Sequence, residues 1–102
     1  MLADLARRFG QRVRPVTLTG DEGEDRERMT RAAPGPIDCV LDLPPPSAGT
    51  TPVRAAAMTV RECGRVVLMG GVGMLGGDDL GLPYPWIMRN NITIRGQRSL
   101  LT

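Results

Sequence analysis

The chain has 102 residues, a length that suits one small domain with a single core. A hydrophobic fraction of 41% is slightly below the range of ordinary soluble domains and far from that of a disordered tail. Only 3% of the residues are aromatic, so aliphatic side chains must fill the core. The net charge of +2, with arginine as the only basic residue type, is too small to predict a nucleic-acid or anionic-membrane partner. The sequence contains no histidine, which excludes Ser-His-Asp, Cys-His and other histidine-based catalysis.

Signals for targeting and metal binding are missing from the sequence. No stretch approaches the ~20 apolar residues of a membrane span, and the acidic start Met1–Asp4 is unlike the basic start of a signal peptide. We therefore expect a cytoplasmic protein with no membrane partner. Cys39 and Cys63 are too far apart for a CxxC motif, so we expect no metal site. Both cysteines are predicted to be small core residues or neutral turn positions.

The first third of the chain predicts two helices around a weak strand. Four apolar residues recur at helical spacing: Leu2, Leu5, Ala6 and Phe9. They predict a helix over residues 2–9. Residues 13–18 predict a short strand, which Pro15 restricts to a sheet edge or an irregular position. The charged stretch 21–33, acidic first and basic later, suits the helix dipole and predicts a surface helix ended by Pro34.

The middle of the chain has the first strong strand signal. Residues 37–43 form a near-continuous apolar run, which is typical of a strand covered on both faces. The prolines at 44–46 end it. Thr51 is a good N-cap for a helix over residues 52–62, because a proline occupies the first helical position. Gly64 is predicted to lie just past the end of this helix.

The last third continues the alternation of helices and strands. Residues 65–69 predict a second strong strand, and a glycine-rich loop follows over residues 70–81. One helical turn is expected within 82–89, and a final strand over 92–95. Alternating strands and helices predict an α/β fold with a parallel sheet, whose ligands bind beyond the carboxyl ends of the strands.

The stretch Gly71–Gly76 matches the pattern G-x-G-x-x-G and follows a strand. A dinucleotide fingerprint must open a helix and be followed by an acidic residue after the next strand. Here poor helix formers follow the motif, and the next strand ends without an acid. A flexible loop over a cofactor site is therefore favoured, with a plain surface loop and a true fingerprint as the alternatives.

Four segments, taken with their order and spacing, resemble a known protein family: residues 37–42, 64–71, 82–90 and 92–97. They resemble the medium-chain dehydrogenase/reductase family, with alcohol dehydrogenase-like and quinone oxidoreductase-like members nearest. The resemblance extends over roughly residues 2–97. It implies that residues 1–102 form an incomplete Rossmann-type dinucleotide-binding domain, with strands similar to the third to sixth and flanking helices.

The resemblance implies a cofactor-binding edge built from the residues that follow the fourth, fifth and sixth strands. These are Leu43, Pro44, Met69, Gly70, Gly71, Gly96 and Gln97. It implies NAD or NADP as the cofactor, with weak or no binding by this chain, and it assigns no catalytic or metal-binding residue. Because dimeric members commonly associate around the sixth strand, it also implies self-association through Leu82–Gly96.

The departures from the family pattern are equally informative. The first two strands, the fingerprint and the catalytic domain would precede Met1, the tail 98–102 diverges, and Glu62–Cys63 replaces a common Pro-Gly turn. We therefore expect a truncated chain, and the flanking DNA would test this. In the strand order 3-2-1-4-5-6, the third strand loses its neighbours. Either it pairs beside the fourth strand, or the N-terminal third stays loose around a sheet of strands four to six.

The expected function is that of a fragment of an NAD(P)-dependent alcohol dehydrogenase-like oxidoreductase. Such an enzyme moves a hydride to or from a small alcohol, aldehyde or quinone, and the fragment is expected to be inactive alone. The alternative is a non-catalytic dimerisation or interaction module derived from such a domain. A third interpretation is the product of a degraded gene that never accumulates.

Several other side chains have ordinary structural explanations. Asp42 is expected to cap the loop after its strand, and Tyr84 and Trp86 to anchor a core or an interface. The remaining charged residues are expected to be solvated or ion-paired: Asp78, Asp79, Arg89 and Arg95.

Overall fold

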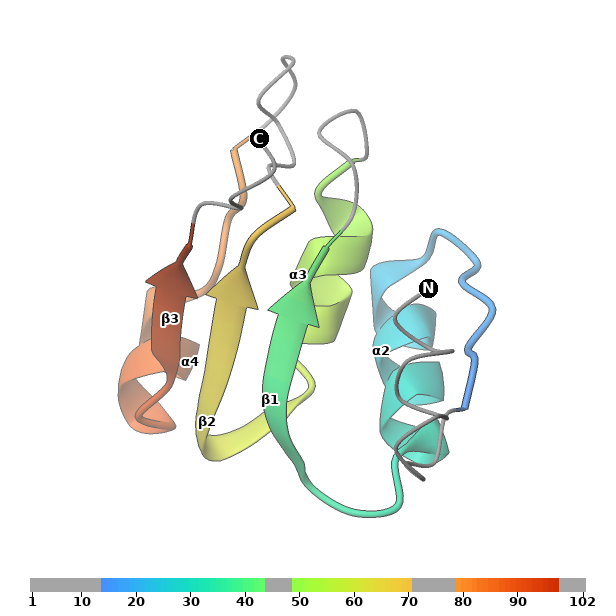
Figure 1. Cartoon of the computed structure of the whole chain (residues 1–102), viewed down its shortest axis with the longest axis horizontal. Coiled ribbons are helices and arrows are strands. Elements are labelled where there is room, and N and C mark those ends of the chain that lie inside the picture. Colours follow the sequence, from blue (N-terminus) through green and yellow to red (C-terminus); the bar gives the residue numbers. More distant parts are fainter. Residues whose placement is uncertain (1–13, 44–48, 71–78, 98–102) are drawn as a thin grey trace.

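The computed structural model describes residues 14–43, 49–70 and 79–97. Its elements in chain order are α2 (Glu22–Ala32), β1 (Ile37–Asp42), α3 (Thr51–Ala57), β2 (Val60–Leu68), α4 (Tyr84–Arg89) and β3 (Thr93–Gly96). Helices and strands alternate along the chain (Figure 1), which confirms the predicted α/β class. The expected helix over 2–9, the motif 71–76, Pro44 and the tail 98–102 lie outside the described residues.

The three strands form one parallel sheet in the order β1-β2-β3. Val40 of β1 pairs with Val66 of β2, and Val66 pairs with Ile94 of β3. All three carboxyl ends therefore point to the same edge of the sheet (Figure 1). This arrangement is consistent with the expected fourth, fifth and sixth strands of a Rossmann-like sheet.

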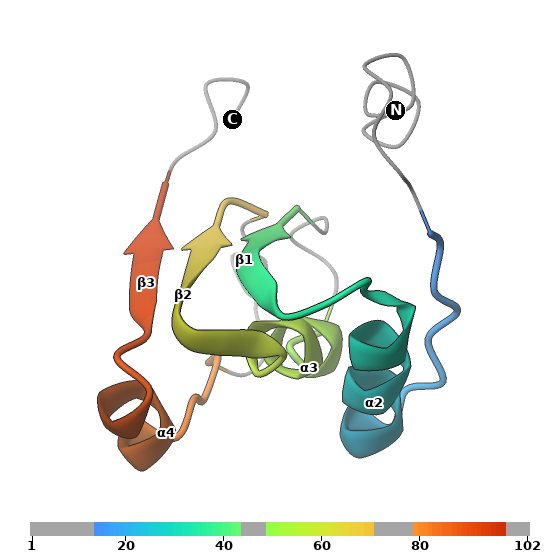
Figure 2. The ribbon, with the colours of Figure 1, turned by 90° about the horizontal axis from the view of Figure 1, so that it is seen from below.

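The described helices cover only one face of the sheet (Figure 2). On that face Ala57, Val60, Val66 and Ile92 form the buried core, and Trp86 of α4 packs against it. The prediction that β1 is covered on both faces is wrong for the described residues, because the side chains that point away from the helices are exposed. Leu41 is 46% exposed. A continuous apolar run shows that a strand can be buried, but the neighbours that bury it come from elsewhere in the chain.

The predicted strand over residues 13–18 is wrong where the structure describes it, because residues 14–19 form no strand. This segment runs along the side of α2 that faces away from β1 (Figures 1 and 2). Its polar groups bind α2 instead of a sheet: Thr19 and Gly20 donate to the carboxylate of Asp25, and Arg28 donates to the carbonyl of Thr17. Of the two expected outcomes, the sheet forms without the third strand.

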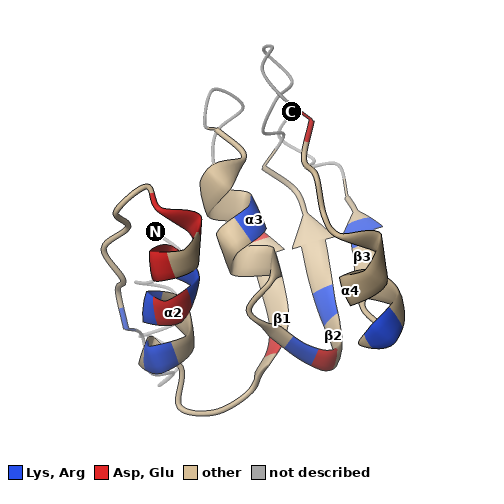
Figure 3. Cartoon of the chain, turned by 180° about the vertical axis from the view of Figure 1, so that it is seen from behind, with Lys and Arg blue, Asp and Glu red and all other residues tan. Residues whose placement is uncertain are grey.

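Helix α2 begins and ends as its charge pattern predicts. The carboxylate of Asp21 caps it by accepting the backbone N–H of Glu24 at 2.9 Å. Acidic side chains gather near its start and basic ones near its end (Figure 3), which complements the helix dipole. Glu24 and Arg28 form an ion pair one turn apart, at 3.0 Å. The helix packs on α3, where Glu22 pairs with Arg54.

Helix α3 is shorter than predicted, since it ends at Ala57 and β2 already begins at Val60. Thr51 is the first helical residue, and Thr50 precedes it without a capping side-chain hydrogen bond. The early strand start arises from an irregular pairing: Ile37 pairs with Val60, but Cys39 pairs with Arg65. The extra residues in β2 make the strand bend sharply, as Figure 2 shows.

The bend in β2 is built by Cys63 and Gly64, which the sequence had predicted to follow the helix. Cys63 has φ 63°, in the left-handed region, and its N–H donates to the carbonyl of Asn90 at 2.7 Å. Gly64 is buried, and a Cβ there would lie 2.8 Å from the carbonyl oxygen of Arg61. Cys63 therefore lies inside β2, at its bend, and not in a turn between elements. Cys39 and Cys63 are both exposed, so the core alternative is wrong.

The C-terminal elements match the predictions within a residue or two. The expected helical turn is α4, which Pro83 precedes, and the expected last strand is β3. None of the described helices combines the length and apolar character needed to cross a membrane.

Candidate functional site

The carboxyl edge of the sheet is the site that the topology defines. Two backbone hydrogen bonds hold neighbouring strand ends together there: Met69 N–H donates to the Asp42 carbonyl at 3.1 Å, and Gln97 N–H donates to the Leu68 carbonyl at 3.0 Å. The peptide groups that follow β1, β2 and β3 therefore form one continuous row. We call this row the crevice edge.

The crevice edge contains five of the seven site residues predicted from the sequence. Leu43 follows β1, and Met69 and Gly70 follow β2. Gly96 ends β3, and Gln97 follows it. Leu43 is 47% exposed, and Gly96 and Gln97 are also exposed. The other two, Pro44 and Gly71, lie outside the described residues. The structure thus brings the described part of the predicted site together along one edge.

Asp42 is the one buried carboxylate at this edge, with 7% of its surface exposed. Burial raises the pKa of the Asp42 carboxyl above its ordinary value, and the backbone N–H of Gly70 partly offsets this by favouring the ionised form. The side chain therefore interacts with the end of β2. The predicted cap on the loop after β1 involves residues 44–48, which lie outside the described residues. Asp42 links the ends of two strands and faces the interior.

The chemistry available at the crevice edge is that of backbone donors and acceptors. The described residues contain no cluster of three or more cysteine and carboxylate side chains able to hold a metal ion. An extended ligand with amide and hydroxyl groups can be recognised by such a row of peptides, because parallel sheets present their ligand-binding groups at this end. The described residues of this edge can therefore position a ligand.

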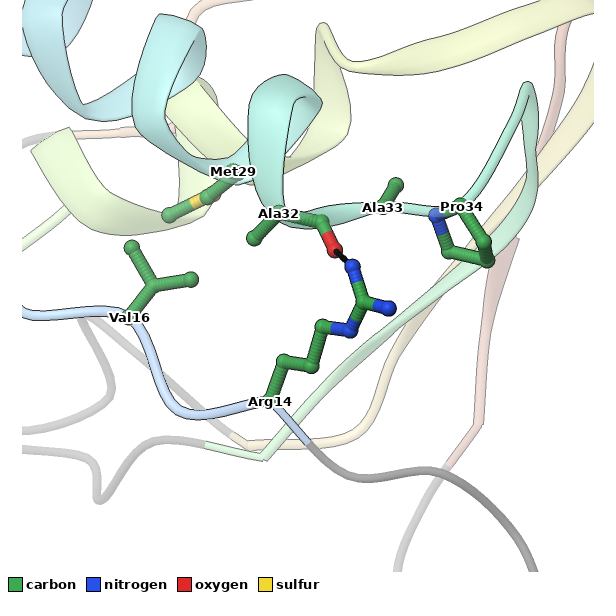
Figure 4. Close-up of a pocket in the computed structure, with 6 residues that line it drawn as sticks. All are labelled: Arg14, Val16, Met29, Ala32, Ala33 and Pro34. Carbon is green, nitrogen blue, oxygen red and sulfur yellow. Dashed lines mark hydrogen bonds between the residues drawn. The ribbon is translucent and has the colours of Figure 1, made fainter.

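A second feature, which the sequence did not predict, is a hollow of about 260 Å³ beside α2. Its lining is mostly apolar and is drawn in Figure 4: Arg14, Val16, Met29, Ala32, Ala33 and Pro34. The guanidinium of Arg14 donates to the carbonyl of Ala32 at 3.3 Å, so it closes the helix end. Its lining shares no residue with the crevice edge. We assign it no chemistry.

Asp25 is a buried carboxylate that the sequence analysis also missed. It accepts the N–H and the hydroxyl of Thr19 at 2.7 and 2.8 Å and the N–H of Gly20 at 3.0 Å. The Thr19 N–H is the main reason that the pKa of Asp25 lies below its ordinary value. A Thr-Gly pair just before a helix was the available signal. These hydrogen-bond partners all belong to the loop before α2, so Asp25 holds this loop against the helix.

The aromatic and charged residues near β3 divide between core and surface. Trp86 is half-buried against the core, which confirms one of its two predicted roles, whereas Tyr84 is 76% exposed. Arg89, Arg95 and Asp79 are exposed, as predicted for solvated charges. Asp78 lies outside the described residues.

Comparisons with known proteins do not narrow the assignment. No protein-family model, no curated protein and no solved structure matches the chain. Function must therefore be argued from the geometry of the crevice edge and from the sequence itself.

Proposed function

We propose that this chain supplies the nicotinamide-binding side of an NAD(P)-dependent oxidoreductase domain of the medium-chain dehydrogenase/reductase type. The observation that carries the proposal is the crevice edge, where the peptides after three adjacent parallel strands form one row held by backbone hydrogen bonds. That is the place where open α/β sheets bind ligands. When bound, the oxidised nicotinamide would accept a hydride from a small alcohol, or the reduced nicotinamide would donate one to a small aldehyde or quinone.

The backbone at Cys63 gives independent support. The family resemblance places a Pro-Gly turn where this chain has Glu62-Cys63, and Cys63 has the left-handed φ that favours glycine. A cysteine would adopt this conformation if it had replaced the glycine of an ancestral Pro-Gly turn. The free, exposed thiols of Cys39 and Cys63 also suit the reducing cytoplasm, which is the proposed location.

The described residues fit the cofactor only in part. Leu43, Gly70 and Gln97 offer backbone groups to the nicotinamide and its ribose. Helix α4 has six residues and begins at Tyr84 without a side-chain cap, and no glycine turn opens it within the described residues. A pyrophosphate is held by a glycine-rich turn at a helix N-terminus. We therefore expect weak binding, confined to the nicotinamide half of the cofactor.

The test is a titration of isotope-labelled protein with reduced nicotinamide mononucleotide, followed by amide NMR shifts. We expect shifts at Gly70, Gly96 and Gln97, and none with adenosine monophosphate. Gly96→Val should abolish them, because a Cβ at Gly96 meets no atom within 4 Å and the added side chain blocks the edge without disturbing the fold. Gly35→Val is the matched control, since Gly35 is equally open. Shifts confined to the hollow beside α2 would contradict the proposal.

A second candidate function is self-association through Leu82–Gly96. Its support is that β3 is an exposed edge strand and that three large apolar residues in this stretch are exposed: Tyr84 at 76%, Met88 at 59% and Ile94 at 37%. Sedimentation should then show a dimer that Ile94→Arg disrupts. Leu18→Arg is the control, because Leu18 is an apolar residue that is 42% exposed and lies far from residues 82–96 in the sequence. A monomer at all concentrations would exclude this module.

A further inference from the structure

The face of the sheet opposite the helices carries two different kinds of side chain. Val66 is fully buried on the helical side, and Val40, its partner on β1, packs against the same core. Because side chains alternate along a strand, the neighbouring rows of paired residues point away from the helices. No described helix lies on that side of the sheet (Figure 2). We call this surface the outer face, and it contains two paired rows: Cys39 with Arg65 and Thr93, and Leu41 with Val67 and Arg95.

The half of the outer face that lies over β1 is apolar. Leu41 is 46% exposed, and Leu43, the next residue of β1 and its extension to point the same way, is 47% exposed. Val67 lies beside Leu41 on β2 and is partly exposed. Strands of a parallel sheet with such residues are normally covered on both faces by helices. This half of the outer face therefore favours contact with an apolar surface.

The half of the outer face that lies toward β3 is cationic. Arg65 and Arg95 are both exposed, and they stand on neighbouring strands one alternation apart. The ion pairs found in the described part of the chain all use other arginines. The two paired rows contain no carboxylate. Two guanidinium groups are therefore available to carboxylates of a partner, beside an apolar strip.

These charges count against a cover supplied by the same sequence. A second copy bound through the same face would present two further arginines and no carboxylate to Arg65 and Arg95. Residues 1–13 are also basic, with Arg7, Arg8 and Arg12 against a single aspartate. Like charges across an interface oppose binding. The outer face is therefore suited to a different, acidic partner.

The dimensions of the outer face suit one short helix. Three strands spaced about 4.8 Å apart span roughly 10 Å, which is about the diameter of a helix with its side chains. From Cys39 to Leu43 the apolar strip extends about 13 Å, at roughly 3.3 Å per residue. A helix of about nine residues has the same length.

We propose that the outer face is a docking surface for an acidic amphipathic helix of a partner protein. The apolar side of that helix covers Leu41, Leu43 and Val67. Carboxylates along one flank of the helix pair with Arg65 and Arg95. The docked helix forms a second layer on the side of the sheet that the described helices leave open. This inference is independent of the proposed function, because it concerns a face of the sheet and needs no nicotinamide.

The probe is a synthetic amphipathic helix of about three turns, with leucines on one side and glutamates along one flank. A second peptide has lysines in place of the glutamates. Each peptide carries a fluorescent label, and its anisotropy is followed as the protein is added. We expect the glutamate peptide to bind at least about tenfold more tightly, because two exposed charge pairs change from attraction to repulsion in the lysine peptide. The double variant Arg65→Glu with Arg95→Glu should reverse this preference.

Two further variants separate the outer face from the rest of the surface. Arg31→Glu with Arg89→Glu makes the same change in net charge at exposed arginines of α2 and α4, and it should keep the preference for the glutamate peptide. Leu41→Ser should weaken the binding of both peptides by a similar factor. The fluorescence of Trp86, the single tryptophan, checks that each variant keeps the helical-side core.

Three results would overturn the proposal. The first is that neither peptide binds saturably below about 1 mM, as happens when another part of the chain already covers the face. The second is that the double variant Arg65→Glu with Arg95→Glu keeps the preference of the native protein. The third is that sedimentation finds a native dimer that Leu41→Ser dissociates, because a second copy then occupies the outer face.

Discussion

Gly64 allows the sharpest prediction, because the bend of β2 leaves no room for a side chain there. A Cβ at this position would lie 2.8 Å from the Arg61 carbonyl oxygen, 2.9 Å from the Val60 Cβ and 3.2 Å from the Asp38 carbonyl oxygen. Two of these three atoms belong to the backbone, so no flexible side chain can move aside. Gly64→Ala must therefore shift β1 away from β2 or straighten the bend.

The expected cost follows from overpacking in a tightly packed interior. Forcing an extra carbon into such a space destabilises a protein by about 1–3 kcal/mol. We expect about 2 kcal/mol for Gly64→Ala, since two contacts would be shorter than 3.0 Å and a third would be tight. For a domain of this size that free energy corresponds to a decrease in Tm of roughly 10 °C.

The assay is urea unfolding followed by the fluorescence of Trp86, which packs against the core beside β2. Gly35→Ala is the control, because a Cβ at Gly35 meets no atom within 4 Å. Replacing an unhindered glycine by alanine is neutral or stabilising by roughly 0.5 kcal/mol. If the free energies of unfolding of the two variants agree within about 0.5 kcal/mol, the close packing assigned to the bend is refuted.

Three further substitutions test other parts of the structure by urea unfolding. Cys63→Gly should stabilise the protein by about 1 kcal/mol, because glycine adopts the left-handed φ without the penalty that a side chain carries. A destabilised variant would count against the left-handed conformation of Cys63. Because the pKa of Asp25 is lowered in the folded protein, the free energy of unfolding should decline as the pH falls through that lowered pKa. Asp25→Asn should remove this decline. The raised pKa of Asp42 has the opposite effect: the free energy of unfolding should fall as the pH rises from the pKa of Asp42 in the unfolded chain to its pKa in the folded protein. Asp42→Asn should remove this dependence on pH and be more stable at neutral pH. A variant with the same pH dependence as the native protein would exclude Asp42 as its source.

Local patterns in the sequence determined the class of fold and most of its elements. The apolar runs at residues 37–43 and 65–69 became strands, since β-branched and aliphatic residues bury well in a parallel sheet. Prolines and charge patterning placed the ends of α2, because a helix cannot continue into Pro34 and its dipole favours acids first. The order of these strands also brought most of the predicted crevice edge together.

Tertiary structure decided the features that depend on partners distant in the chain. The local sequence of residues 14–19 predicts a strand, but the N–H groups of Thr19 and Gly20 donate to the carboxylate of Asp25. Among the described residues, no neighbouring strand pairs with this segment. Helix α3 ends early because β2 pairs with Ile37 and bends at Cys63, which binds the carbonyl of Asn90. A residue's backbone preference is local, whereas strand pairing and burial are decided by whichever neighbours the fold brings to it.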